Sequence, residues 1–171
     1  MATTTTISQV GEFPLISSMV GDLTMGQAVT LGPGDDGAVF QVDGSAVVST
    51  DVLVEEVHFR RRWSTATDVG RKAVAVNVSD IEAMGAVPVA LVVGFSAPGD
   101  LPASWAREFM AGMTAESQKA GVSVVGGDTT GGPVVSIAVT VIGQTAGMAP
   151  VRRDGAVPGD EVAAVSYTHL R

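Results

Sequence analysis

The run PVALVVGFSA at residues 88–97 constrains the fold more than any other feature, because it is apolar along its whole length and rich in valine. Such a run predicts a strand that is buried in a sheet. Two later runs, VSVVGG and VVSIAVTVIGQT, are also β-rich and flank the segment GDTTGGP. We therefore expect this part of the chain to supply three strands.

Two long helices are expected between and beside these strands. Thr67 is the expected N-cap of the first helix, which is closed by Gly85. Asp100 and Pro102 open the second helix, and Gly121 ends it. Apolar side chains recur at every fourth position of the second helix and are assigned to the core: Leu101, Trp105, Phe109 and Met113.

The N-terminal part of the chain predicts a short helix and a hairpin. The helix lies in GEFPLISSMVGDL, with Phe13, Ile16 and Val20 on one side. GAVFQVD and SAVVSTDVLVE predict two strands joined at Asp43-Gly44. The order helix, hairpin, helix, strand, helix, strand, strand predicts an α+β fold, a mainly antiparallel sheet with helices packed on one face.

The length of 171 residues suits one domain and the start of another. We expect a loose N-terminus over residues 1–10 and the main domain over 11–150. RRDGAVPGDEVAAVS predicts a turn and a strand that begins a truncated second domain over 151–166. Residues 167–171 fit no predicted element, and we interpret them as a non-native tail.

Composition excludes several classes of function. The formal net charge of −8 and the presence of two lysines argue against nucleic-acid binding. The absence of cysteine excludes disulfides, thiolate metal sites and a cysteine nucleophile. We find no pattern of a secretory signal or a membrane helix, so we expect a soluble, cytoplasmic protein.

Acidic residues beside hydroxyl side chains form the candidate site. The set comprises Asp35, Asp36, Asp51, Asp80 and Asp128, with Ser49 and Thr50 next to Asp51. Two carboxylates about 4 Å apart repel by roughly 4 kcal/mol at an effective dielectric near 20, so five that converge need cations. Oxygen ligands without thiolates suit Mg²⁺, whose coordination in proteins is usually completed by substrate phosphates. The pattern predicts a phosphate-handling magnesium site.

Asp80 is the most informative member of this set. Its predicted helix is mostly apolar, and Asn77 lies three residues before it on the same face. A carboxylate beside a core needs a partner, and neither Arg71 nor Lys72 has the spacing to provide one. The alternative, that each aspartate only forms a turn or caps a helix, stays open.

Four motifs together resemble the bacterial thiamine-monophosphate kinase family: GPGDDGAVF, VVSTDVLVEEVHF, KAVAVNVSDIEAMGA and VVGGDTTGGP. They follow that family's order and spacing over about residues 11–165. The resemblance implies the N-terminal domain of a PurM-like fold, within the aminoimidazole-ribonucleotide synthetase-like superfamily. It also implies a homodimer, in which two copies of this domain form a β-barrel, and a C-terminal half that closes the active site.

The resemblance further implies a reaction, in which the γ-phosphate of ATP moves to thiamine monophosphate and gives thiamine diphosphate and ADP. The residues that match the family's magnesium ligands are Asp35, Asp36, Ser49, Thr50, Asp51, Asp80 and Asp128. Gly127, Asp128 and Arg153 match ATP contacts, and His58 matches a position near the substrate. The acceptor is itself a phosphate, so no general base is assigned. The chain also has no Walker motif, GxxxxGK[ST].

Other interpretations remain open. The chain could belong to another ATP-dependent enzyme of the superfamily, a purine-pathway synthetase or a hydrogenase-maturation protein. It could instead be a noncatalytic dimerisation module whose acidic loops bind Ca²⁺. A loop histidine is the simpler interpretation of His58, and a solvated turn is the simpler interpretation of RRRW at residues 60–63. The family continues well past PGDEVAAVS, so we expect this polypeptide alone to bind ATP weakly or not at all.

Overall fold

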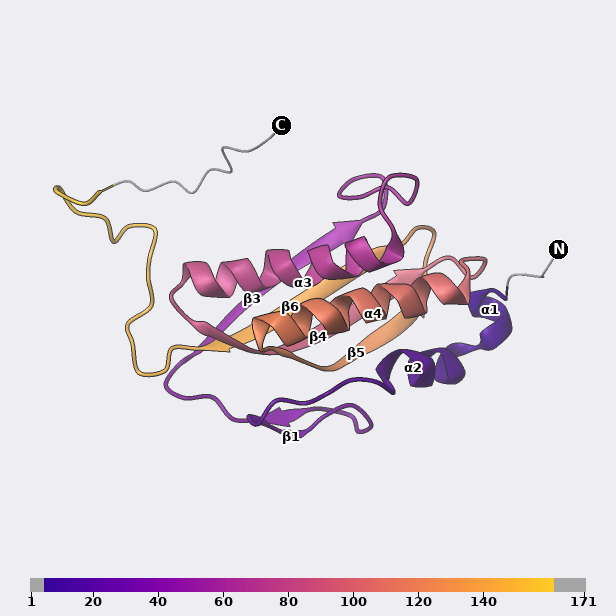
Figure 1. Cartoon of the computed structure of the whole chain (residues 1–171), viewed down its shortest axis with the longest axis horizontal. Coiled ribbons are helices and arrows are strands. Elements are labelled where there is room, and N and C mark those ends of the chain that lie inside the picture. Colours follow the sequence, from indigo (N-terminus) through magenta and orange to yellow (C-terminus); the bar gives the residue numbers. More distant parts are fainter. Residues whose placement is uncertain (1–4, 162–171) are drawn as a thin grey trace.

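The computed structural model describes residues 5–161 and shows a four-stranded sheet covered on one face by two long helices (Figure 1). The strands are β3 (Ala46–Val54), β4 (Val87–Ala97), β5 (Ser123–Gly131) and β6 (Ser136–Gln144). In the order β3-β6-β4-β5, β6 pairs antiparallel with β3 and β4, whereas β4 and β5 are parallel. The predicted α+β class with a mainly antiparallel sheet is confirmed.

The covering helices are α3 (Ala66–Ala83) and α4 (Ala103–Ala120). Helix α3 begins after Thr65, two residues before the predicted cap at Thr67, because Thr65 and Asp68 form a reciprocal capping box. Hydrogen bonds from the Thr65 side chain and backbone hold the pKa of Asp68 below its usual value of 3.8. Helix α4 ends as predicted at Gly121, which adopts the left-handed conformation with φ of 66°.

The two helices approach closely because glycines face the neighbouring backbone. A Cβ on Gly70 would lie 2.1 Å from the carbonyl oxygen of Phe109, and a Cβ on Gly112 would lie 2.2 Å from that of Thr67. Between the helices and the sheet lies the main core, which contains the side chains predicted for α4. Leu101, Phe109 and Met113 are buried, and the partly buried Trp105 packs against them.

The N-terminal region forms α1 (Ile7–Val10), α2 (Glu12–Val20) and a separate two-stranded ribbon of β1 (Val29–Leu31) and β2 (Val39–Phe40). The predicted hairpin between GAVFQVD and SAVVSTDVLVE is therefore wrong, because β2 pairs with β1 while β3 pairs with β6. The turn at Asp43-Gly44 exists, but it bonds to the end of β6: Ala146 donates to the Asp43 carbonyl, and Ser45 donates to the Thr145 hydroxyl. It carries the chain from one sheet to the other.

The buried face of α2 also differs from the prediction. Leu15 and Met19 are buried in the main core, whereas Phe13 is 82% exposed. The predicted stripe of Phe13, Ile16 and Val20 is displaced by about one position, because α2 docks against α4 through its other apolar residues. Short helices with apolar residues on several sides do not specify their own docking face.

The two ends of the described chain differ from the prediction. Residues 7–10, expected to be loose, form α1, and residues 151–161 contain turns without a strand. The rest of the predicted second unit and the tail over 162–171 lie outside the described residues.

The sheet is open in this chain, so the β-barrel and the homodimer stay predictions. Within the described part, every helix is too short or too polar to cross a membrane.

Candidate functional site

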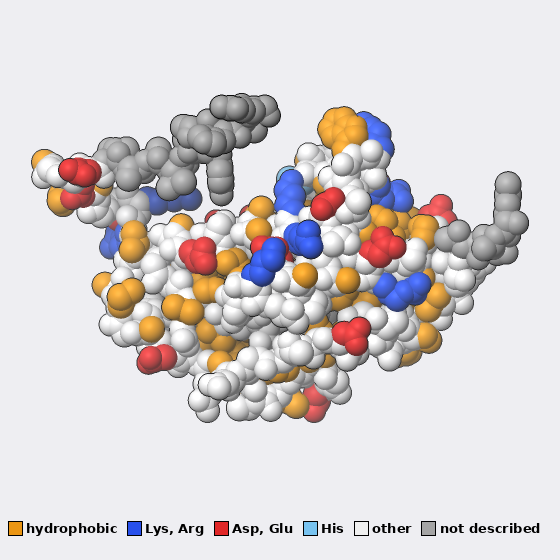
Figure 2. Space-filling view, in the orientation of Figure 1, with side chains coloured by type: hydrophobic (Ala, Val, Ile, Leu, Met, Phe, Trp, Pro, Cys, Tyr) orange, Lys and Arg blue, Asp and Glu red, His pale blue; other side chains and the backbone are white. Residues whose placement is uncertain are grey.

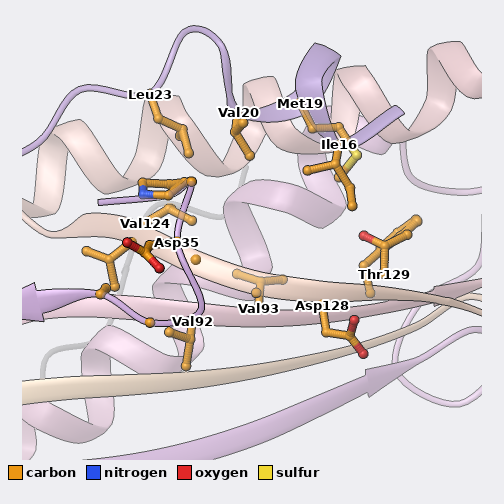
Figure 3. A pocket seen from close by; sticks show the side chains of 18 of the residues that line it. Ile16, Met19, Val20, Leu23, Asp35, Val92, Val93, Val124, Asp128 and Thr129 are labelled. Atoms are coloured by element: carbon orange, nitrogen blue, oxygen red, sulfur yellow. The ribbon is translucent and has the colours of Figure 1, made fainter. Parts of the chain in front are cut away.

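A cavity of about 360 Å³ lies at the β5 edge of the sheet, lined by α2, the glycine-rich segment 33–38, β4 and β5 (Figure 3). The glycine-rich segment contributes Asp35 and Asp36, and β5 contributes Gly127 and Asp128. The Asp36 backbone N–H donates to Asp35 Oδ1 at 2.9 Å, which tightens the loop. Apolar walls with a few polar groups are typical of a small-molecule site.

Gly127 has a structural role in this cavity that sequence reasoning did not find. It pairs with Val93 of β4, and a Cβ at this position would lie 2.1 Å from the Val93 carbonyl oxygen. The parallel pairing of β4 and β5 therefore requires glycine, whatever ligand it contacts. Asp128 follows directly, pairs with Gly94 and exposes its carboxylate.

A second polar group lies where α3 crosses β3. Ser49 Oγ donates to Asp80 Oδ2 at 2.9 Å, and the Asp51 backbone N–H donates to Asn77 Oδ1 at 3.1 Å. Asp80 is exposed, so the expectation that it is tucked against the core is wrong. The buried polar side chain of this helix is Asn77, and the sequence signal for it was an amide inside an otherwise apolar face.

Two arginines that follow β6, Arg152 and Arg153, line a cavity together with residues of this second group. A cavity of about 380 Å³ is lined by Ser49, Asp80, Arg152 and Arg153 among others. Arg152 pairs with Asp154 at 2.6 Å, whereas no carboxylate in residues 5–161 lies within ion-pair distance of Arg153. The predicted ATP contact Arg153 thus lines the same cavity as Ser49 and Asp80.

The aspartates of the first cavity, Asp35, Asp36 and Asp128, and the second polar group, Ser49, Asp51 and Asp80, stand at opposite edges of the sheet. Asp51 lies in one cross-strand row with Val139, Val93 and Gly127. Three strand spacings of about 4.8 Å separate the ends of this row by roughly 14 Å. Asp128 is one residue beyond the row, so its side chain points to the opposite face from that of Asp51. In Figure 3, Asp128 and Asp35 lie at separate places around the cavity, and their carboxylates do not face one another.

No three acidic or histidine side chains gather closely enough to hold a metal ion within residues 5–161. The five predicted aspartates therefore do not converge in a single chain. Each group alone still has donors that fit a partial Mg²⁺ site, because this ion commonly takes one or two protein carboxylates and completes its shell with waters and phosphates. Carboxylate and hydroxyl oxygens are the donors at both edges.

Two predicted site residues belong to neither group. Thr50 points to the sheet face away from the helices, and its hydroxyl donates to the Val139 carbonyl at 2.9 Å. His58 lies in the loop after β3, where its Nδ1 accepts a hydrogen bond from the Val54 N–H at 3.0 Å. Lys72 Nζ donates to the His58 carbonyl at 2.6 Å, so this histidine shapes the loop.

The arginines of the turn that follows His58 form ion pairs within their own loop. The three arginines pair with two glutamates of the same loop, Glu55 and Glu56. Trp63 is 70% exposed, and the guanidinium carbon of Arg60 lies 4.2 Å from the centre of its ring. Figure 2 shows apolar, basic and acidic side chains together on this projecting loop. These contacts favour the solvated turn over a phosphate clamp.

Comparison with known proteins places these features in a family. A family model described as AIR synthase related protein, N-terminal domain, matches residues 34–145. Thiamine-monophosphate kinase of Mycobacterium tuberculosis (strain H37Rv) is 48% identical over 161 residues, which cover 94% of this chain and 48% of that protein. The enzyme of the same name from Corynebacterium glutamicum is 40% identical and covers 85% of this chain and 43% of its own length. The chain thus spans about half the length of the curated relatives it matches.

Solved structures give the same result. Thiamine monophosphate kinase from Aquifex aeolicus superimposes with a TM-score of 0.63 at 36% identity, covering 66% of this chain and 37% of that one. A structure described as AaThiL complexed with AMPPCP and TMP matches with a TM-score of 0.56 at 29% identity, over 79% of this chain and 42% of the other. Hydrogenase maturation protein HypE in complex with ATP matches at 0.60 and 28% identity, over 73% and 38%. This chain belongs to the AIR synthase related protein family, and the matched region is that family's N-terminal domain.

Proposed function

We propose that this chain is the N-terminal, ATP- and Mg²⁺-binding half of a thiamine-monophosphate kinase, EC 2.7.4.16. The reaction would move the γ-phosphate of ATP to thiamine monophosphate and yield thiamine diphosphate and ADP. The observation that carries the proposal is the 48% identity to the Mycobacterium tuberculosis enzyme over 94% of this chain. The cavity between the aspartate pair of segment 33–38 and β5 supports it, because both elements belong to the matched region.

The proposed metal ligands come from the two edges of the sheet. They are Asp35, Asp36 and Asp128 at the β5 edge, and Ser49, Thr50, Asp51 and Asp80 at the β3 edge. Bound Mg²⁺ would offset the repulsion between the nucleotide and the acceptor phosphate. Thr50 enters this set through the family resemblance alone, because its side chain lies on the opposite face of β3 from Ser49 and Asp51 and its hydroxyl donates to the Val139 carbonyl.

The remaining residues would bind and orient the two anions. Arg153 would contact ATP from the cavity that it shares with Asp80. Gly127 would let the nucleotide approach the β5 backbone, and His58 would lie near the substrate. The acceptor phosphate has a second pKa near 6 and is largely dianionic at neutral pH, so no side chain has to remove a proton. The task left to the protein is alignment and charge stabilisation.

A homodimer formed through the sheet is part of the proposal. The face away from the helices carries Val48 and Val52 of β3, which are 61% and 46% exposed. Exposed apolar side chains on one face of an open sheet are typical of a surface that another sheet covers. The proposed domain spans residues 11–150, and residues 151–166 would begin the half that closes the site.

The test is a turnover assay with the complete product of the gene that encodes this chain. Incubation with ATP, Mg²⁺ and thiamine monophosphate should yield thiamine diphosphate and ADP, resolved by chromatography. The variant Asp128→Asn is the matched negative control, because its exposed carboxylate can be removed without disturbing the core. An enzyme that binds ATP but forms no thiamine diphosphate would refute the proposed substrate.

The structural match to a hydrogenase maturation protein in complex with ATP supports one alternative, another ATP-dependent enzyme of this superfamily. Calorimetry separates both enzymes from a noncatalytic Ca²⁺-binding module. An enzyme should bind Mg²⁺ only together with nucleotide, because phosphates complete the shell. The module should bind Ca²⁺ without nucleotide.

A further inference from the structure

Asn77 is a buried polar side chain at the junction of α3 and β3. Its side chain is completely buried, while its neighbours on the same helix face, Val74 and Ile81, are apolar and equally buried. The Asn77 Nδ2 group donates to the Ala73 carbonyl at 2.9 Å, and its Oδ1 accepts from the Asp51 N–H at 3.1 Å. The amide is therefore satisfied by one bond within its helix and one bond to the strand.

The bond from Asn77 to the strand reaches the backbone of Asp51. A buried amide that loses its partners costs free energy, so an apolar residue would be the simpler choice for a helix that only has to cover the core. One turn later on the helix, Asp80 accepts from Ser49. Asn77 and Asp80 are three residues apart on α3, and their partners Asp51 and Ser49 are two residues apart on β3. The two bonds together therefore fix the position of the helix along the strand.

We propose that Asn77 is a positioning residue, which holds the backbone of Asp51 against α3 so that Asp51 and Asp80 act together on one divalent cation. The inference rests on the proposed function, since it assigns a residue that orients two of the proposed metal ligands. Asn77 does not touch the cation. It acts through the Asp51 backbone, as partners of metal ligands commonly do, and loss of such a partner lowers metal affinity by about 10- to 100-fold.

The test measures Mn²⁺ affinity by electron paramagnetic resonance in the complete gene product, with a nonhydrolysable ATP analogue present. Asn77→Leu removes both side-chain bonds and keeps the number and branching of the side-chain heavy atoms, and the Mn²⁺ dissociation constant should rise about 10-fold or more. Val74→Ala is the matched control, because Val74 is buried one turn earlier on the same helix and has no polar side chain. It should lower the melting temperature and leave the Mn²⁺ affinity unchanged.

Amide hydrogen exchange provides a second readout that does not need the metal. In Asn77→Leu the Asp51 amide should exchange about 10-fold faster, the effect of one lost hydrogen bond. In Asn77→Asp the remaining carboxylate oxygen can still accept that bond, so exchange at Asp51 should stay within about 3-fold of the parent protein. If Asn77→Leu does not fold, Asn77→Ala takes its place in both measurements, because it removes the same two bonds without adding bulk or a buried charge.

Three results would overturn the inference. Asn77→Leu could bind Mn²⁺ as tightly as the parent, Val74→Ala could weaken binding equally, or Asp51 exchange could be the same in the parent, Asn77→Leu and Asn77→Asp. A parent protein that binds no Mn²⁺ with the nucleotide analogue would refute the proposed function itself and the role of Asn77 with it. That outcome is distinguishable, because in the first three the parent still binds the metal.

Discussion

Replacement of Gly127 by alanine tests whether the β5 wall of the cavity depends on strand packing. A Cβ at this position would lie 2.1 Å from the carbonyl oxygen of Val93 and 3.0 Å from its carbonyl carbon. Both obstacles are backbone atoms, so no side-chain rotation relieves the clash, and β4 and β5 must move apart by about 1 Å. Overpacking of this kind costs about 1–3 kcal/mol.

That loss of stability has a measurable size and a matched control. For a chain of this length it lowers Tm by about 2–12 °C in a thermal melt followed by circular dichroism. Gly126→Ala is the control, because a Cβ on Gly126 would meet no atom within 4 Å and its φ is not in the left-handed region. It should leave the stability unchanged or raise it by up to about 1 kcal/mol.

The comparison also separates a structural glycine from one needed only by a ligand. Gly127→Ala should lose stability in the absence of nucleotide, because the clash is with the protein's own backbone. If Gly127→Ala melts within about 1 °C of Gly126→Ala, the close approach of β4 and β5 does not limit this position, and the reasoning from strand packing is refuted.

Three further predictions concern the carboxylates, the α3 cap and the sheet face. Asp80→Asn and Asp128→Asn should each keep Tm within about 2 °C of the parent, since both side chains are exposed, yet lower turnover about 100-fold or more; matching losses of stability would indicate a structural role instead. Because hydrogen bonds from Thr65 lower the pKa of Asp68, its stabilising effect is full above pH 3.8 and is lost as the pH falls through the lower, folded value. The Tm difference between Asp68→Asn and the parent should therefore vanish in strong acid, and a difference that is constant with pH would contradict this. Val52→Lys should abolish a sheet-mediated dimer in analytical ultracentrifugation, and a dimer that persists would exclude this face.

The elements that followed from local patterns were predicted well. The apolar run that forms β4 and the four-residue spacing along α4 are sufficient to identify a buried strand and a core-facing helix. The partner of β2 was not predictable, because Asp43-Gly44 has the composition of a hairpin turn whichever strand follows. In the structure, the Asp43-Gly44 turn forms hydrogen bonds with the end of β6, and β3 then pairs with β6 in the large sheet.

For the candidate site, too, some features could be predicted from the sequence and others could not. Motif resemblance predicted Asp80 and Ser49 as site residues, which stays a prediction, and the structure joins the two side chains by a hydrogen bond. The exposure of Asp80, the burial of Asn77 and the steric need for Gly127 were not visible in the sequence. Each of these depends on a neighbour far away in the chain, so no local pattern reports it.

The sequence by itself determined the two long helices, the four strands of the large sheet, the oxygen-only chemistry of the acidic residues and the family to which the chain belongs. The elements and the chemistry follow from residue type and short-range spacing, and the family follows from the resemblance of four motifs. Tertiary structure alone decided that Asp51 and Asp128 lie on opposite edges and opposite faces of the sheet. The physical reason is that strand order and register are set by burial between distant segments, and a shift of one residue turns a side chain to the other face.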